Sequence, residues 1–193
     1  PPILDLLEPA WISEGFTYPQ EEAQYKQDAA ELLTAYQQRL KGKEPPVLAV
    51  EHRFTFNLDD VTVTGRIDRI DLDKADRLTL VDYKTSRRKM TENEARQDPQ
   101  LALYAMYILQ AREISGRQLA RPEAMDLTYY FLRTREPEVT VTFNEQELAD
   151  FRQRIAQAAG GIRRQDFPFQ TGYHCNFCDY KDLICPAWEQ KRL

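Results

Sequence analysis

Three residues near the middle of the chain carry side chains that could hold a hard metal ion and act on a phosphodiester. Asp82 and Lys84 stand two positions apart in an apolar, β-branched stretch, so on a strand both point to one face. Asp68 lies in a similar stretch just before, across a polar turn at 73–76. In a hairpin, Asp68 would lie beside Asp82. Two carboxylates and one ammonium so placed favour Mg²⁺ or Mn²⁺ and phosphodiester cleavage.

The same residues also have a purely structural interpretation. Asp68 with Arg66 or Arg69, and Asp82 with Lys84, could be cross-strand ion pairs on a solvated sheet face. Taken alone, they favour that interpretation. Downstream, Gln100 and Tyr104 are four residues apart and share one face of a predicted helix, whose apolar face can pack on the sheet. This ordered combination favours the metal site.

Elements that position these residues can be predicted from hydrophobic periodicity. The pattern predicts an irregular segment over 1–18, helices over 20–41, 91–115 and 144–161, and strands over 47–58, 61–71, 77–85, 124–133 and 138–143. The first three strands form an antiparallel meander. We therefore expect an α/β fold of the α+β type, with a central mixed β-sheet flanked by helices.

Length and composition predict one soluble domain over residues 1–193, with a cysteine-containing tail over 166–193. No apolar run is long enough to cross a membrane. The start has no secretion-signal pattern and the few cysteines form no disulfide framework, so we expect a cytoplasmic protein. The start at Pro1 suggests a processed or truncated chain. The net charge of −5 argues weakly against non-specific coating of nucleic acid, since carboxylates that bind metal also contribute negative charge.

The stretches 65–71, 82–85 and 100–104 together resemble the RecB-type branch of the PD-(D/E)xK nuclease superfamily, over about residues 20–186. The resemblance implies a restriction-endonuclease-like core. It implies that Asp68 and Asp82 bind metal, that Lys84 positions the attacking water or stabilises phosphate charge, and that Gln100 and Tyr104 face the site from the following helix.

Other positions are less specific. The family often carries a glutamate on the strand before Asp68, so Glu51 is a candidate for the metal shell, and a structural role is at least as common. The upstream histidine of RecB-type nucleases has no counterpart, because the two histidines, His52 and His174, lie elsewhere. The basic cluster of Arg87, Arg88 and Lys89 follows the proposed site, where a DNA backbone would pass.

The tail holds the three cysteines of the chain, Cys175, Cys178 and Cys185. Their close spacing and odd number indicate a metal site rather than disulfides. They resemble the C-terminal part of the iron–sulfur staple of several RecB-type nucleases, whose fourth cysteine lies far upstream. Three interpretations stand: a [4Fe–4S] cluster, a zinc site completed by His174, and a reduced set without metal.

The resemblance implies a metal-dependent deoxyribonuclease, expected to be an exonuclease on single strands or duplex ends in DNA repair or recombination. Such domains commonly work with a helicase, and no phosphate-binding loop is present in this sequence. One alternative is a non-catalytic DNA-binding or scaffold module of a helicase–nuclease complex. Another is a CRISPR-adaptation nuclease.

Overall fold

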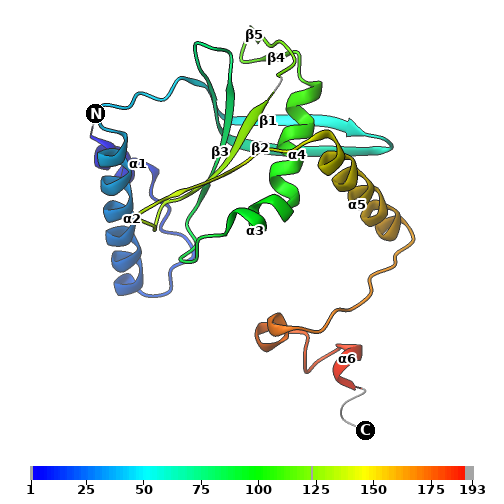
Figure 1. Ribbon diagram of the computed structural model, residues 1–193. Coiled ribbons are helices and arrows are strands. Elements are labelled where there is room, and N and C mark those ends of the chain that lie inside the picture. Colours follow the sequence, from blue (N-terminus) through cyan, green and yellow to red (C-terminus); the bar gives the residue numbers. More distant parts are fainter. Residues whose placement is uncertain (1, 123, 190–193) are drawn as a thin grey trace. The chain divides into compact units, whose positions relative to one another are not determined.

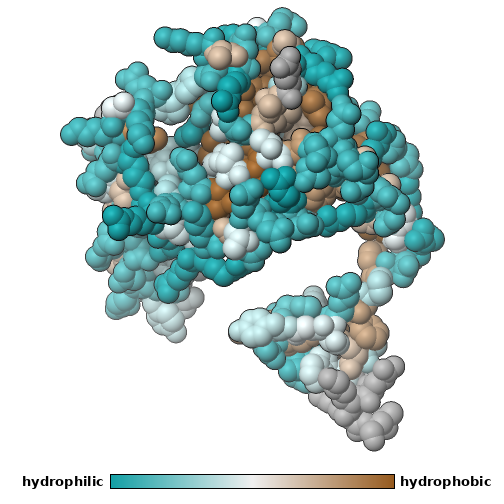
Figure 2. Space-filling model, in the orientation of Figure 1, coloured by the Kyte–Doolittle hydropathy of each residue, from teal (hydrophilic) through white to brown (hydrophobic). Residues whose placement is uncertain are grey.

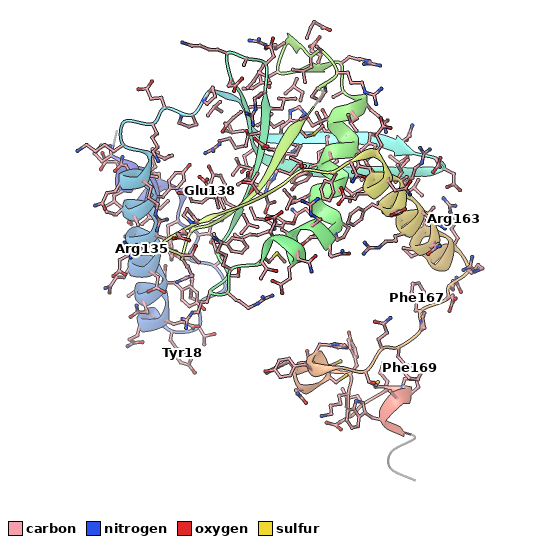
Figure 3. The ribbon with its side chains drawn as sticks, in the orientation of Figure 1. Tyr18, Arg135, Glu138, Arg163, Phe167 and Phe169 are labelled. Atoms are coloured by element: carbon pink, nitrogen blue, oxygen red, sulfur yellow. The ribbon has the colours of Figure 1, made fainter. Side chains whose placement is uncertain are left out.

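The computed structural model describes residues 2–122 and 124–189. The chain separates into two compact units, one ending at Phe151 and the other beginning at Arg152, and each is described by itself. The second unit contains the end of helix α5, the short 3₁₀ helix η2 (Tyr173–Phe177) and helix α6 (Pro186–Glu189). Phe167 and Phe169, on the extended segment between α5 and η2, are largely exposed (Figure 3).

The first unit is built on a five-stranded mixed sheet in the order β1-β2-β3-β6-β7 (Figure 1). Its strands are β1 (Val47–Leu58), β2 (Val61–Leu72), β3 (Leu78–Lys84), β6 (Met125–Phe131) and β7 (Glu138–Val141). The first three strands pair antiparallel, as predicted, β3 pairs parallel with β6, and β6 pairs antiparallel with β7. The predicted α+β fold with a mixed central sheet is confirmed.

The helices are η1 (Ile3–Leu6), α1 (Leu7–Ala10), α2 (Pro19–Leu40), α3 (Glu92–Gln97), α4 (Pro99–Gln110) and α5 (Glu145–Arg163), whose last part belongs to the second unit. Helices α4 and α2 pack on opposite faces of the sheet. Helix α4 contacts β1 and β6. Tyr36 of α2 contacts Tyr83 of β3, which points to the opposite face from Asp82 and Lys84 because successive strand residues alternate. Among the described residues, no helix is both long and apolar enough to cross a bilayer.

The predicted continuous helix over 91–115 is wrong. Proline disfavours a helical conformation in the preceding residue, and Asp98 before Pro99 has φ −79° and ψ 123°. Asp98 ends α3 and caps α4, where its side chain accepts from the Gln100 N–H at 2.9 Å. After α4 the chain forms a small hairpin of β4 (Glu113–Ile114) and β5 (Arg117–Gln118). The break places Gln100 in the first turn of α4.

The core lies between the sheet and α4. Its fully buried side chains include Ile67, Ile70, Leu80, Leu101, Leu127 and Tyr129. Phe54 stacks on Tyr107, with ring centroids 4.7 Å apart, and meets Tyr104 edge-on. The absence of a side chain at Gly65 permits this packing, because a Cβ there would stand 2.5 Å from the tip of the Phe54 ring. The outer surface is mostly hydrophilic on the face drawn in Figure 2.

Candidate active site

The proposed carboxylates lie just past the end of a strand ladder. The last regular pair between β2 and β3 is Arg69 with Val81. One residue further on each strand stand Asp68 and Asp82. There the Asp68 carboxylate, rather than a backbone carbonyl, accepts the Tyr83 N–H, at 2.8 Å from Oδ2 to N. The two aspartates therefore occupy neighbouring positions on adjacent strands, as a hairpin predicts.

Helix α4 presents two polar side chains to Asp82. Gln100 donates from Nε2 to Asp82 Oδ2 at 2.7 Å and to the Tyr104 hydroxyl at 2.8 Å. The Tyr104 hydroxyl stands 3.0 Å from the same Asp82 oxygen and 2.9 Å from the Arg66 carbonyl oxygen, to either of which it can donate. These hydrogen bonds hold the Oδ2 atom of Asp82, and Gln100 and Tyr104 do not contact its Oδ1 atom.

Lys84 occupies the remaining side of Asp82. Its Nζ lies 2.5 Å from Asp82 Oδ1 and donates to Gln100 Oε1 at 2.8 Å. The ammonium also stands 4.5 Å from the ring centroid of Tyr129, a favourable cation–π position. The Tyr129 hydroxyl donates to the same Gln100 oxygen at 3.3 Å. The amide of Gln100 thus contacts both members of the ion pair, since its oxygen accepts from Lys84 and its nitrogen donates to Asp82.

Burial controls the electrostatics of the site. Asp82 is 4% exposed, and burial raises the pKa of its carboxyl; Lys84 opposes this rise, and the charge of Asp68 adds to it. Burial and the neighbouring Asp82 charge raise the pKa of Tyr104 well above its usual range. Tyr104 therefore remains a neutral hydrogen-bond donor, while Asp82 depends on nearby cations to stay ionised.

Comparison with known proteins identifies the family. A family model described as the PD-(D/E)XK nuclease superfamily matches residues 2–186. The chain belongs to this superfamily. Among solved structures, SSO0001 is 21% identical with a TM-score of 0.40, over 86% of this chain and 71% of that one. A candidate exonuclease from Eubacterium rectale is 12% identical with a TM-score of 0.45, over 98% and 80%. No curated protein matches the chain.

Nucleases of the PD-(D/E)XK superfamily use divalent metal ions, and the acidic pair fits such an ion. Asp82 Oδ1 is buried and makes no hydrogen bond of regular geometry, although it faces the Lys84 ammonium. Within the part of the chain that the structure describes, no group of three or more His, Cys, Asp or Glu side chains gathers as metal ligands. An ion held by Asp68 and Asp82 would keep several waters, as Mg²⁺ prefers.

Glu51 lies outside this group. Its carboxylate pairs with Arg66 at 2.9 Å, and both side chains are more than half exposed. Its backbone has φ +50°, in the left-handed region, and no regular pair joins Glu51 to Asp68 between the pairs Val50–Arg69 and His52–Ile67. The candidate role of Glu51 in the metal shell therefore has no supporting contact among the described residues.

The irregularity at Glu51 also changes which residues face the core. On β1 the buried position before Glu51 is the odd-numbered Ala49, and the first one after it is the even-numbered Phe54. On β2 the buried positions change in the same way from the odd-numbered Ile67 to the even-numbered Ile70. In a regular strand, buried positions stay all odd or all even, so both strands switch faces between these pairs. The register of β1 with β2 is the same on both sides of Glu51, so the irregularity there adds no extra residue; the register shift lies between Val47 and Ala49. From Ile70 to Asp68 the alternation is regular, so Asp68 stays on the face of Asp82 as the hairpin predicts, whereas the change of face next to Ile67 was not predicted from the sequence.

Glu51→Gly is expected to leave metal-dependent cleavage within about twofold of wild type. Glycine accepts positive φ without strain, so the unfolding free energy should stay within about 1 kcal/mol. Glu51→Val should destabilise by about 1–2 kcal/mol, since a β-branched residue is strained in this conformation. Urea unfolding and a cleavage assay measure both effects. A large loss of cleavage in a well-folded Glu51→Gly variant would restore Glu51 to the metal shell.

The basic cluster after β3 is partly engaged in structure. Arg88 donates to both oxygens of Glu94, at 2.9 and 3.0 Å, and Lys89 donates to the Glu136 carbonyl at 2.7 Å. Glu94 is also the capping-box residue of α3. Arg87 is exposed and makes no hydrogen bond or ion pair with other described residues. DNA binding by Arg87, Arg88 and Lys89 stays a prediction, with Arg87 the most available of the three.

Two ligand candidates of the cysteine tail lie close to backbone groups. Cys175 is buried and its Sγ accepts the Gly172 N–H at 3.4 Å, while the His174 ring lies 3.0 Å from the Gln170 carbonyl oxygen. The three sulfurs and His174 do not form a ligand group within the described residues. The [4Fe–4S] and zinc interpretations of the tail stay predictions.

Proposed function

We propose that this chain is a metal-dependent deoxyribonuclease that hydrolyses phosphodiesters at the Asp68–Asp82–Lys84 site. The observation that carries the proposal is the state of Asp82, which is buried with one oxygen fixed by α4 and the other facing only a cation. A plain surface ion pair would not need this enclosure. Its burial argues against the structural interpretation of these residues as solvated cross-strand pairs.

Each side chain has a distinct task in this proposal. Asp68 and Asp82 would hold the divalent ions, which when bound supply charge for an activated water and for the leaving oxygen. Lys84 is long enough to leave Asp82 and place its positive charge where the phosphate gathers negative charge in the transition state. Gln100 and Tyr104 keep Asp82 oriented through its Oδ2 atom. Tyr129 supports the Lys84 ammonium with its ring.

We extend the proposal to an exonuclease of the RecB type that acts on single strands or duplex ends in DNA repair or recombination, with a helicase as partner. The resemblance of the stretches around Asp68, Asp82 and Gln100 supports this finer assignment.

End-labelled linear single strands, linear duplexes and covalently closed circles test the activity and its mode. With Mn²⁺ or Mg²⁺ we expect the linear substrates to be degraded and the circles to survive, and EDTA should abolish all cleavage. Cleavage of circles would indicate an endonuclease. Binding of DNA without any metal-dependent cleavage would support the scaffold alternative instead.

A further inference from the structure

A buried cluster lies on the sheet face opposite the proposed active site. Arg69 of β2 donates from Nη1 to the Tyr83 hydroxyl of β3 at 2.5 Å and to the Tyr36 hydroxyl of α2 at 3.1 Å. The two hydroxyls are 2.6 Å apart. Asp71 pairs with Arg69 Nε at 3.0 Å, and both side chains are only 10–12% exposed. Tyr130 of β6 closes the cluster, with its ring edge-on to those of Tyr36 and Tyr83.

This cluster joins the two strands where their backbone no longer does so. The regular pairing of β2 with β3 ends at Arg69 and Val81. Beyond that pair, Asp68 and Tyr83 are joined by the bond from the Tyr83 N–H to the Asp68 carboxylate. Tyr83 therefore has two connections to β2: its backbone reaches Asp68 on the active face, and its hydroxyl reaches Arg69 on the other.

We infer that Arg69 and Tyr83 are positioning residues for the metal-binding carboxylates. Arg69 holds the Tyr83 side chain, which fixes the end of β3 and with it the N–H that orients Asp68. Tyr36 extends this support to helix α2. The guanidinium suits the task because its planar donors can serve Asp71 and the hydroxyls at the same time, which an ammonium cannot do with the same geometry. The inference rests on the proposed metal site.

Tyr83→Phe tests the inference with the smallest change. It keeps the ring, its edge-on contacts and the backbone N–H, and it removes only the hydroxyl that Arg69 and Tyr36 contact. Partners that orient metal ligands typically change metal affinity by about 10- to 100-fold, so for this more remote group we expect Mn²⁺ affinity to fall by about 3- to 10-fold. Calorimetry or electron paramagnetic resonance of Mn²⁺ without DNA measures it. Cleavage at saturating Mn²⁺ should recover to near the wild-type rate.

Thr128→Val is the matched control. Thr128 is buried in the neighbouring strand β6, and its hydroxyl lies 2.8 Å from that of Thr140 on β7, so the variant also loses a hydroxyl contact within the sheet. Thr128→Val should bind Mn²⁺ like the wild type. Equal Mn²⁺ affinity in Tyr83→Phe and Thr128→Val would overturn the inference, because any loss would then reflect general destabilisation.

Tyr36→Phe decides the matter if Tyr83→Phe does not fold. It removes the Tyr36 hydroxyl of α2 and keeps the hydrogen bond between Arg69 and the Tyr83 hydroxyl. We therefore expect a smaller loss of Mn²⁺ affinity, about 2- to 3-fold. Unchanged affinity in Tyr36→Phe would then overturn the inference. If the wild-type chain binds Mn²⁺ no better than Asp82→Asn, the proposed metal site itself is contradicted. This result is distinct from one that contradicts only the role of the positioning residues.

Discussion

Asp82→Asn is expected to reduce metal-dependent cleavage by about 10³-fold or more. The change removes a charge that would hold the divalent ion, and a loss of about 4 kcal/mol of transition-state stabilisation corresponds to that factor. Asparagine has nearly the same shape and can still accept from Gln100 and Tyr104, so the fold should persist. Single-turnover cleavage of labelled DNA and thermal unfolding measure the two effects.

Asp126→Asn provides the control for this result. Asp126 is a partly exposed aspartate of β6 that pairs with Arg77, outside the proposed site. The Asp126→Asn variant should cleave DNA at the wild-type rate. Retention of more than about a tenth of the activity in a folded Asp82→Asn variant would contradict the assigned role of Asp82 as a metal ligand.

Lys84→Met is expected to lower the cleavage rate by about 10²- to 10³-fold, the range typical of a lost group that stabilises transition-state charge. It should also shift the pH dependence. Asp82 acts as a carboxylate, so cleavage falls as pH falls through its pKa, which burial already raises and Lys84 opposes. Without Lys84 that pKa rises further, and the acidic limb of the profile should move to higher pH.

Rates measured across pH for the wild type and Lys84→Met test this shift. Lys74→Met serves as control, because Lys74 is an exposed lysine of the turn between β2 and β3, outside both the proposed site and the basic cluster. Its acidic limb should coincide with that of the wild type. An unchanged limb in Lys84→Met would show that Lys84 does not control the ionisation of Asp82.

The strands were predictable because their sequences are dense in β-branched and aromatic residues and are separated by clear turns. The turn around Asp59 ends β1 and begins β2 within one residue of the predicted bounds. Alternation also put Asp82 and Lys84 on one face, where they contact each other. The long helix was wrong because periodicity outweighed Pro99, a signal that was present in the sequence.

Other features of the site depend on tertiary contacts that no local pattern encodes. Tyr129 reaches Lys84 only because β6 pairs parallel with β3, a connection across more than forty residues. The support of Tyr83 by Arg69 and Tyr36 likewise requires the packing of α2 on the sheet. The left-handed backbone conformation at position 51 could not be predicted, because the residue there is a glutamate and not a glycine or asparagine.

The contact of Lys84 with Asp82 also affects the stability of the fold. A buried carboxylate with no counter-ion costs several kcal/mol, so an empty site built from acidic groups alone would strain the fold. Here the Lys84 ammonium supplies the counter-charge to the buried Asp82 carboxylate. A divalent ion bound at Asp82 would take the place of the Lys84 ammonium beside Oδ1, while Gln100 and Tyr104 would keep the carboxylate oriented through Oδ2. The Asp82 carboxylate is therefore both balanced in charge and held in orientation by side chains of this chain.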